Sequence, residues 1–369
     1  MAREFAEKEM KPNAAKYDKG EEFPDDVMKK AFEVGFLTCT IPKEYEGGGL
    51  SDLDTVIISE ELAAGCAGMY TTMMVNALAY SPIIHFGSDE QKKKYLTPPT
   101  KEMSFASFCL TEREAGSDAG SIKTKAIKKG DEYIINGSKC FISNGAIASF
   151  YVVFALTDPE KGARGMSAFI VPRETPGLNI GKIEDKMGHR ASNTAELYFD
   201  DLKVPASNLL AKEGLGFIIA LKTLDRTRAP VGAAGVGVAR AALEYAIDYA
   251  RTRVQFGRPI ALFQHISFKI AQLATEIDAA RHLVWRAAWL MDEGLPCGKE
   301  SAMAKFFGSD VAMKVTTEAL QIFGGYGYMK DYPMEKLMRD AKLLQIYEGT
   351  NEIQRLVISR ELIGPIKTK

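Results

Sequence analysis

The chain of 369 residues carries 47 Lys and Arg against 48 Asp and Glu, a net charge of −1, and 46% of its residues are hydrophobic. This is the balance of a soluble globular protein, and its length allows two or three domains. The near-neutral charge gives no footprint for nucleic acid, and no apolar run approaches the ~18 residues of a membrane span. Five dispersed cysteines and four histidines lack metal-ligand spacing. They argue against a disulfide framework or a metal site and favour a reducing compartment.

Residues 1–103 predict an α-helical domain. Strong helix formers (Ala, Glu, Lys, Met and Leu) dominate this region, and loops are expected near Pro42–Gly49 and Pro98–Pro99. The N-terminus is charged and lacks the apolar core of a signal peptide. Its helical pattern starts abruptly, as if some leading residues were missing.

Residues 104–210 predict an antiparallel, barrel-like β domain. Asn136-Gly137 stands between two β-rich runs and is typical of a type I′ hairpin turn. Further short β-rich runs separated by turn residues follow, at 151–154, 168–171 and 196–199.

Residues 211–369 return to helical periodicity. Helices near 216–250, 264–293, 299–322 and 334–362 favour a four-helix bundle. The glycines between Gly232 and Gly237 are interpreted as close helix packing. The chain order, α then β then α, lacks a Gly-x-Gly-x-x-Gly turn between a strand and a helix, which argues against a dinucleotide-binding doubly wound sheet.

The segment Tyr347-Glu348-Gly349-Thr350 is the first candidate for chemistry. Glu348 stands directly before a glycine, which permits close approach of the backbone to a ligand, and its carboxylate could act as a general base. Taken alone, the segment is more typical of an ordinary helix break with a surface glutamate.

Three other segments offer ligand contacts. The stretch 108–118 could form an anion-binding concavity, although an ordinary polar loop has the same composition. In 253–259, Arg253 and Phe256 are three residues apart, which places them on one face of a helix where the arginine suits phosphate, or at a solvated helix end. The glycines of 321–327 allow close approach to a flat ligand, or form a plain loop.

Taken together, these motifs resemble the acyl-CoA dehydrogenases. The motifs are Thr-Glu-x-x-Ala-Gly-Ser-Asp from Thr111, Phe-Ile-Ser-Asn-Gly from Phe141, Arg-x-x-Phe-Gly from Arg253, Gln-Ile-Phe-Gly-Gly from Gln321 and Tyr-Glu-Gly-Thr from Tyr347. The resemblance extends from Ile41 to Arg360 and is strongest to short- and medium-chain, butyryl-CoA dehydrogenase-like members. The family fold is an α-helical domain, a β-barrel domain and a C-terminal four-helix bundle, the same architecture that the patterns predict.

The resemblance implies FAD-dependent oxidation of an acyl-CoA thioester to the 2-enoyl-CoA. Glu348 then removes the α-proton, and flavin N5 accepts the β-hydride. Some relatives carry this base on a neighbouring helix, at the position of Thr227, which cannot serve as a base. The resemblance therefore assigns the catalytic role to Glu348.

The resemblance also implies FAD contacts. They comprise Phe108, Leu110, Thr111, Gly116, Ser117, Phe141, Ser143, Arg253, Phe256, Gln264, Gln321, Gly324, Gly325, Thr350 and Glu352. Relatives often have Trp and Thr where this chain has Phe141 and Ser143. Because family members share FAD sites between subunits, an obligate homotetramer, a dimer of dimers, is expected.

The resemblance implies substrate contacts as well. Ser117, Asp225, Arg228 and Gly349 match contacts to CoA or to the thioester. Tyr70 and Met74 match positions that close the acyl pocket, and their bulk favours a short or compact acyl group; equally, they are ordinary core residues. Arg113-Glu114 replaces the Pro-Gly that relatives usually carry at the site mouth.

Other functions stay open at this point. An acyl-CoA oxidase passes electrons to oxygen but is usually much longer, and a non-catalytic assembly protein on the same fold would not need Glu348. The expected electron acceptor is an electron-transferring flavoprotein. The expected location is the bacterial cytoplasm, or the mitochondrial matrix in a eukaryote. Acyl-chain length and the physiological direction are not set by these motifs.

Overall fold

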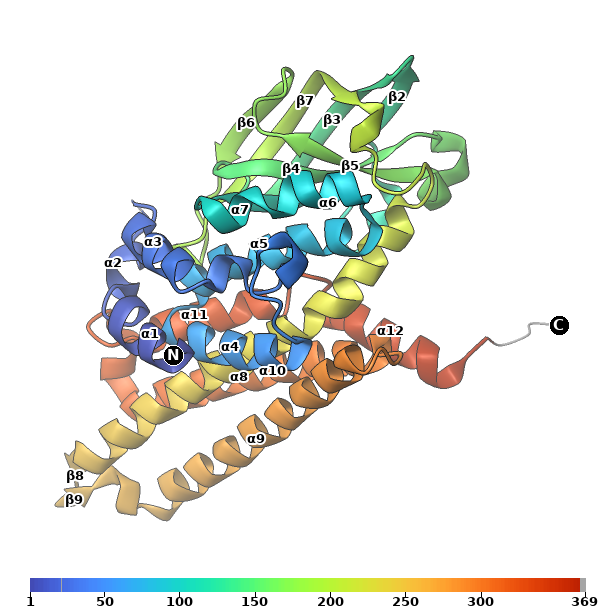
Figure 1. The fold of residues 1–369 in the computed structure, drawn as a ribbon. Helices are drawn as coiled ribbons and strands as arrows, with labels where there is room; N and C mark the ends of the chain where they lie inside the picture. The colour runs from blue at the N-terminus through green and yellow to red at the C-terminus, as the bar shows by residue number, and fades with distance from the viewer. Residues whose placement is uncertain (21, 366–369) are drawn as a thin grey trace.

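The computed structural model describes residues 1–20 and 22–365, which form helices, then a sheet, then helices again (Figure 1). The helices before the sheet are α1 (Ala2–Phe5), α2 (Ala14–Asp18), α3 (Asp25–Glu33), α4 (Asp52–Gly65), α5 (Ala67–Phe86), α6 (Asp89–Leu96) and α7 (Pro98–Lys101), with a π-helical turn at Ala6–Met10 and 3₁₀ turns at Phe36–Thr38 and Lys43–Tyr45. The expected helical region is present. The Pro98–Pro99 pair begins α7 instead of forming a loop, because the fixed φ of proline suits the first turn of a helix.

Helix α5 is the central helix of this first part. Its residues from Ala67 to Asn76 are all buried, so the helix has no solvated face over that stretch. Helix α4 leads into it and begins with a capping box, in which Ser51 Oγ accepts a hydrogen bond from Asp54 N at 3.0 Å and Asp54 caps Ser51 N in return. The two helices place the N-terminal side of the candidate site.

The middle part is a curled sheet of seven strands. They are β1 (Phe105–Cys109), β2 (Lys125–Lys129), β3 (Glu132–Ser143), β4 (Ala148–Leu156), β5 (Met166–Pro172), β6 (Leu178–Ile183) and β7 (Thr194–Pro205), in the order β1-β4-β2-β3-β7-β6, with β5 on β4. Four strand pairs are antiparallel, as expected: β2–β3, β3–β7, β4–β5 and β6–β7. However, β4 runs parallel to β1 from Phe105↔Ala148 to Cys109↔Val153 and to β2 at Lys125↔Leu156, so the pairing is mixed.

The hairpin predicted at Asn136-Gly137 is wrong. Strand β3 continues through both residues, and the turn lies earlier, where Lys129 of β2 pairs with Glu132 of β3. The register against β7 shifts between Ile135 and Gly137, which marks a β-bulge. Gly137 has φ +149°, and a Cβ there would lie 2.5 Å from the Thr124 hydroxyl, so the glycine serves the bulge and not a turn.

The third part is built on long helices. They are α8 (Gly216–Thr252), α9 (Gln264–Asp292), α10 (Gly298–Phe323), α11 (Met334–Leu344) and α12 (Asn351–Ile363), with the short strands β8 (Val254–Gln255) and β9 (Arg258–Pro259) between α8 and α9. Three of the predicted helices are present. The fourth, expected over 334–362, is divided into α11 and α12, because Glu348 (φ +52°) and Gly349 (φ +90°) take left-handed conformations that no α-helix contains.

Glycines allow α8 and α10 to approach closely, as the sequence predicted. A Cβ on Gly235 would lie 2.5 Å from the carbonyl oxygen of Gly308 in α10. We expect Gly235→Ala to lower the thermal unfolding midpoint, because forcing a methyl group against backbone costs about 1–3 kcal/mol. The helix propensity of alanine returns about 1 kcal/mol. A midpoint that rises in the variant would show that the helices can separate freely.

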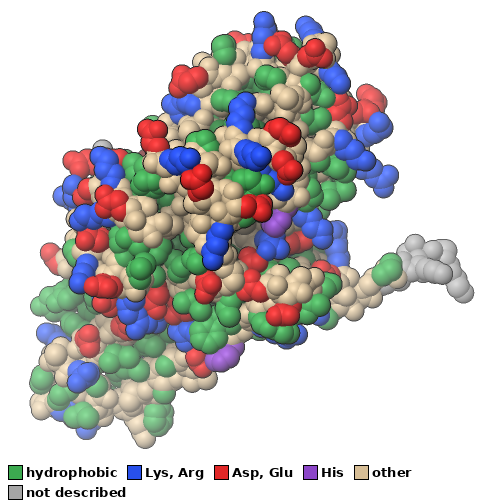
Figure 2. Space-filling model, in the orientation of Figure 1, with side chains coloured by type: hydrophobic (Ala, Val, Ile, Leu, Met, Phe, Trp, Pro, Cys, Tyr) green, Lys and Arg blue, Asp and Glu red, His purple; other side chains and the backbone are tan. Residues whose placement is uncertain are grey.

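The surface agrees with the near-neutral composition. On the face in Figure 2, basic and acidic side chains are interspersed. None of the helices in residues 1–20 and 22–365 combines the length and apolar character that a membrane crossing requires. The same residues contain no group of three His, Cys, Asp or Glu side chains able to hold a metal ion.

Candidate active site

Glu348 lies in the turn between α11 and α12 and faces a cavity of about 350 Å³. The cavity is lined by the start of α4, by α5, by α8, by the end of α9 and by the turn itself. The Thr227 hydroxyl on α8 donates a hydrogen bond of 2.7 Å to Glu348 Oε2. Asp52 and Asp292 also line this cavity, but Asp52 pairs with Arg226 and Asp292 accepts the backbone N–H groups of Asp52 and Leu53.

The surroundings of Glu348 change its acidity. Burial raises the pKa of Glu348 to about 7, against the hydrogen bond from Thr227 and the positive charges of Lys305 and Arg228, which lower the pKa. A carboxyl group that titrates near neutral pH is suited to accept a proton from carbon during a reaction.

Two side chains from other helices fix the backbone of the turn. Lys305 Nζ on α10 donates to Gly349 O at 2.8 Å, and Gln354 Nε2 on α12 donates to the same oxygen at 2.8 Å. Sequence reasoning missed Lys305. A signal was available, since Lys305 falls at helical spacing among Ser301, Gly308 and Ala312 on the buried face of α10.

Tyr70 and Met74 line the same cavity, as the short-pocket prediction requires. Both are buried. The Tyr70 hydroxyl donates to Pro230 O at 2.9 Å, which fixes the ring between α5 and α8. These two side chains form part of the cavity wall contributed by α5.

Tyr347, which precedes Glu348, contacts a buried histidine that the sequence did not single out. The His189 ring lies edge-on to the Tyr347 ring, with centroids 5.9 Å apart. His189 Nε2 lies 3.0 Å from the carbonyl of Asp340 and must carry a hydrogen to donate to it. Its Nδ1 can then accept from the Thr71 hydroxyl at 2.9 Å, and burial lowers the pKa of His189, so the ring stays neutral.

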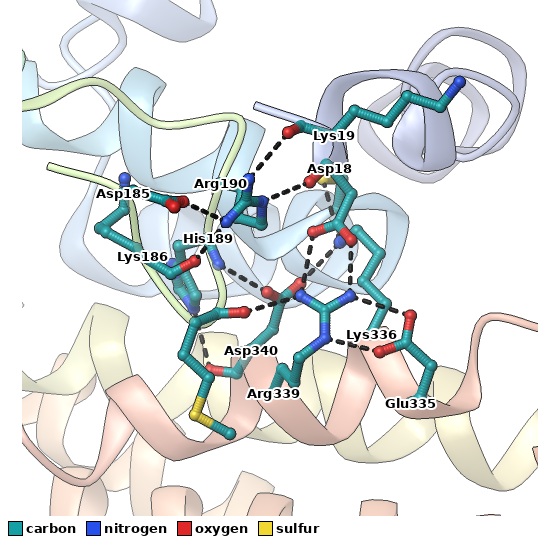
Figure 3. A network of polar contacts seen from close by, with 12 residues as sticks. Asp18, Lys19, Asp185, Lys186, His189, Arg190, Glu335, Lys336, Arg339 and Asp340 are labelled. Carbon is teal, nitrogen blue, oxygen red and sulfur yellow. Dashed lines mark hydrogen bonds and ion pairs between the residues drawn. The ribbon is translucent and has the colours of Figure 1, made fainter. Parts of the chain in front are cut away.

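Side chains of α11 between Glu335 and Asp340 connect all three parts of the chain through polar contacts (Figure 3). Asp340 accepts hydrogen bonds from Lys336 Nζ and from the backbone N–H of His189, each at 2.6 Å. Arg339 donates to Asp18 Oδ2 at 2.5 Å and to Met187 O at 2.8 Å. This network anchors the helix that leads into the turn with Glu348.

Asp225 and Arg228, predicted to contact CoA, form an ion pair of 2.7 Å on α8. Arg228 is buried, and its Nε has no hydrogen-bond partner among the described residues. Asp225 lies beside the start of α10, 3.7 Å from where a Cβ of Gly298 would stand. An unpaired buried guanidinium N–H could donate to a ligand.

The predicted flavin segment in the sheet lies at the end of β1 and along β3. Phe108 packs on Phe154 with ring centroids 4.8 Å apart, and Leu110 is buried. Phe141 is 65% exposed and has φ +57°. The remaining predicted residues here are the part-buried Thr111 and Ser143 and the exposed Gly116 and Ser117.

A buried ion pair, Lys139–Glu112, holds the backbone of this segment. Lys139 Nζ donates to Glu112 Oε1 at 2.7 Å and to Leu110 O at 3.0 Å. Glu112 also accepts from the backbone N–H groups of Lys123 and Thr124. Sequence reasoning placed Glu112 in a motif but gave it no role.

Arg253 and Phe256 do not share a helical face, so that prediction is wrong. Helix α8 ends at Thr252, and the segment turns through the β8–β9 pair, where Phe256 has φ +51° and is 93% exposed. Arg253 instead lines a shallow hollow with Gly324 and Gly325, next to the end of α10. Gln264 and Gln321 are exposed on α9 and α10.

The two groups of predicted FAD residues lie far apart within one chain. Arg253 follows Thr227 by about 26 residues along α8, roughly 39 Å of helix. Figure 1 shows β8 and β9 at the end of α8 that is remote from the sheet. The group around Arg253 therefore lies at the opposite end of α8 from the sheet that carries Phe108 and Phe141.

Three family profiles match this chain. They are the N-terminal domain of acyl-CoA dehydrogenase at residues 1–102, the middle domain at 107–202 and the C-terminal domain at 214–363. An acyl-CoA dehydrogenase of Bacillus subtilis (strain 168) is 50% identical over 99% of this chain and 96% of its own length. An acryloyl-CoA reductase (NADH) of Anaerotignum propionicum is 49% identical over 98% of this chain and 93% of its own length.

Solved structures agree with the fold. Butyryl-CoA dehydrogenase from Megasphaera elsdenii superimposes with a TM-score of 0.96 and is 45% identical, over 98% of this chain and 96% of that one. A chain from the structure described as the electron transferring flavoprotein of Acidaminococcus fermentans gives a TM-score of 0.96 at 50% identity, over 99% and 96% of the two chains.

The fold places a curled sheet between two helical parts in chain order, with a carboxylate-lined cavity among the helices. The chain belongs to the acyl-CoA dehydrogenase family, which consists of FAD-dependent oxidoreductases. The predicted fold class, family and cofactor are thereby confirmed.

Proposed function

We propose that the protein catalyses the α,β-dehydrogenation of a short acyl-CoA thioester, with Glu348 as the base that removes the α-proton. The observation that carries this proposal is the Glu348 carboxylate, held by Thr227 at 2.7 Å and facing a cavity bounded by Tyr70 and Met74. The three-domain division at 1–103, 104–210 and 211–369 is proposed with it.

In the proposed reaction, the carboxylate takes the α-proton as the C–H bond breaks. Bound FAD supplies the acceptor for the hydride from the β-carbon. A pKa of about 7 leaves enough Glu348 ionised at neutral pH to act and makes it basic enough to accept the proton. The negative charge that develops on the thioester oxygen needs a donor, for which the backbone N–H of Glu348 is the candidate.

The residues present fit FAD. The exposed Phe141 ring beside the end of β1 offers a flat apolar surface for a ring system. At the remote end of α8, nothing lies within 4 Å of where Cβ atoms of Gly324 and Gly325 would stand, so a ligand can approach the backbone beside Arg253. We propose that Thr350 and Glu352, at the start of α12, complete the contacts.

We propose that the catalytic unit is an oligomer, and specifically a homotetramer, as the resemblance to the family implies. The support is the position of Arg253, roughly 39 Å along α8 from Thr227 at the cavity, and of β8 and β9 at the end of α8 that is remote from the sheet with Phe141. A dinucleotide bound beside Phe141 in one subunit would meet Arg253, Phe256, Gln264 and Gln321 of another.

For CoA, we propose Ser117 at the exposed loop after β1 and the Asp225–Arg228 pair on α8. The unpaired Nε of Arg228 supports the presence of an acceptor there. Gly349, whose carbonyl is already bound twice, would lie against the thioester.

Acyl length follows from the pocket floor. We expect butyryl-CoA to be turned over faster than hexanoyl-CoA and octanoyl-CoA, and Met74→Ala to shift the preference toward the longer substrates. Each added methylene that the enlarged cavity accepts is worth about 0.8 kcal/mol, roughly fourfold in kcat/KM. A kcat/KM series with the three substrates measures this shift.

Met69→Ala is the matched control, because Met69 is buried on the same helix and Met74, unlike Met69, is among the residues that line the cavity. It should lose stability without changing the substrate order. If the wild-type protein prefers octanoyl-CoA, Tyr70 and Met74 are ordinary core residues and the short-chain assignment is wrong.

The electron acceptor and the direction belong to the same proposal. We propose an electron-transferring flavoprotein as acceptor, which the structural similarity to the Acidaminococcus chain favours. The similar reductase of Anaerotignum propionicum makes 2-enoyl-CoA reduction the second candidate. Turnover is measured with acyl-CoA and an electron-transferring flavoprotein, with 2-enoyl-CoA and NADH, and with acyl-CoA and oxygen, where peroxide is followed. These measurements separate a dehydrogenase, a reductase and an oxidase. A reducing compartment, cytoplasm or mitochondrial matrix, suits the free cysteines.

A further inference from the structure

We propose that Lys305 is a positioning residue of this enzyme, which holds the Glu348–Gly349 turn and places a positive charge behind the catalytic carboxylate. The proposal rests on the role of Glu348 proposed above. It concerns a buried side chain on α10 that does not line the cavity and that would not be expected to touch substrate.

The hydrogen bonds of Lys305 go to the turn and to the first residue of α12. Its side chain is 0% exposed, and Nζ donates to Gly349 O at 2.8 Å and to Asn351 Oδ1 at 2.9 Å. Asn351 is itself fixed, because its Nδ2 donates to Ser309 Oγ at 2.9 Å and to Asp310 Oδ1 at 2.7 Å. The turn is therefore attached to one face of α10.

The turn needs such support. Glu348 has φ +52° and Gly349 has φ +90°, and a non-glycine residue rarely adopts a left-handed conformation without surrounding constraints. The Gly349 carbonyl points to Lys305 and Gln354, which leaves the Glu348 side chain directed at the cavity. If Nζ were lost, Gln354 alone would hold this carbonyl.

The charge of Lys305 is as distinctive as its hydrogen bonds. Both hydrogen bonds go to neutral oxygens. The positive charge of the buried ammonium is therefore not neutralised by a direct partner, and it acts on charged groups farther away. Those groups are Glu348 in the turn, Glu352 on α12, Asp310 on α10 and Arg228 on α8. The positive charge favours the ionised form of Glu348, and Glu348 in turn favours the charged form of Lys305.

The two groups titrate in the same range. Burial lowers the pKa of Lys305 to about 7, while Glu348 and Asp310 oppose this shift, and burial raises the pKa of Glu348 to about 7. The two titrations are coupled, so a proton on Lys305 disfavours a proton on Glu348. Protonation of Lys305 thus helps to keep its partner ionised and able to accept the α-proton.

The decisive experiment compares Lys305→Met and Lys305→Gln with the wild type in the flavin-loaded enzyme. Flavin bleaching is followed by anaerobic rapid mixing across pH, over a series of butyryl-CoA concentrations up to saturation. For Lys305→Met we expect a maximal rate about 10- to 100-fold lower, because the carboxylate is misplaced, with KM changed less than about threefold. The acidic limb should move up by about one pH unit, since removing a cation raises the pKa of Glu348.

Lys305→Gln separates position from charge. Its amide can still donate toward the turn, so we expect a rate at high pH within about threefold of the wild type, with the same shift of the acidic limb. This variant also carries the test if the methionine variant does not fold. Val315→Ala is the matched control, because Val315 is buried on α10 about 15 Å from Lys305 along the helix.

The proposal is overturned if the foldable Lys305 variant keeps the wild-type pH profile. It is equally overturned if Val315→Ala, at the same loss of thermal midpoint, reproduces its rate and its pH profile. Normal bleaching by Glu348→Gln would instead remove the proposed base itself. If only the proposal for Lys305 fails, Glu348→Gln is inactive and the Lys305 variant behaves as the wild type. The failure of one proposal is therefore distinguishable from the failure of the other.

Discussion

Glu348→Gln should keep its flavin and its fold but lose flavin bleaching by acyl-CoA. Gln has the shape of Glu and can still accept the hydrogen bond that Thr227 donates at 2.7 Å, yet it cannot take a proton from carbon. A positioned general base contributes about 10²- to 10⁴-fold, so the bleaching rate should fall by at least that range. Anaerobic rapid mixing with butyryl-CoA measures it.

Glu244→Gln provides the control. Glu244 is an exposed residue of α8 that pairs with Arg240, and its loss should leave the rate unchanged. If Glu348→Gln bleaches as fast as the wild type, another group takes the proton and the assignment of Glu348 is wrong.

The largest effect on stability is expected for Asp340→Ala. Asp340 is fully buried, pairs with Lys336 at 2.6 Å and accepts the backbone N–H of His189 (Figure 3). The nearby positive charge of Lys336 holds the pKa of Asp340 below its usual range, against the opposing effect of burial. Removing the carboxylate leaves a buried ammonium unpaired, which costs about 3–5 kcal/mol. The thermal unfolding midpoint of the flavin-loaded protein reports the loss.

The double variant Lys336→Met/Asp340→Leu tests the cause. Replacement of a buried ion pair by apolar side chains is often neutral, so most of the lost stability should return. If Asp340→Ala unfolds at the wild-type midpoint, or if the double variant is no better than the single one, the cost does not come from the stranded charge.

The fold class could be predicted from the sequence because most helices and strands have their own periodicity or composition within a short stretch of chain. The periodicities of α8, α9 and α10 and the β-rich runs of the sheet are correct. The Asn136-Gly137 hairpin failed because the pair is equally suited to a bulge, and only the neighbouring strand decides between the two: a Cβ at Gly137 would clash with Thr124. A pattern within one strand does not contain that contact.

The same reason explains the divided fourth helix. The residues from Met334 to Ile363 favour a helix on both sides of Glu348, but the turn is held by Lys305, which lies about 40 residues earlier on another helix. Motif order pointed to Glu348, Tyr70 and Met74. His189, Thr71 and Lys305 were missed, because their roles come from contacts between parts of the chain that are distant in sequence.

One reaction of the wild-type protein tests the proposed dehydrogenation most directly. Flavin-loaded enzyme is mixed anaerobically with butyryl-CoA, and the loss of the oxidised flavin band is compared with the 2-enoyl-CoA formed. We predict bleaching accompanied by one equivalent of 2-enoyl-CoA for each flavin reduced. Flavin that stays oxidised in the presence of butyryl-, hexanoyl- and octanoyl-CoA would contradict the proposed dehydrogenation.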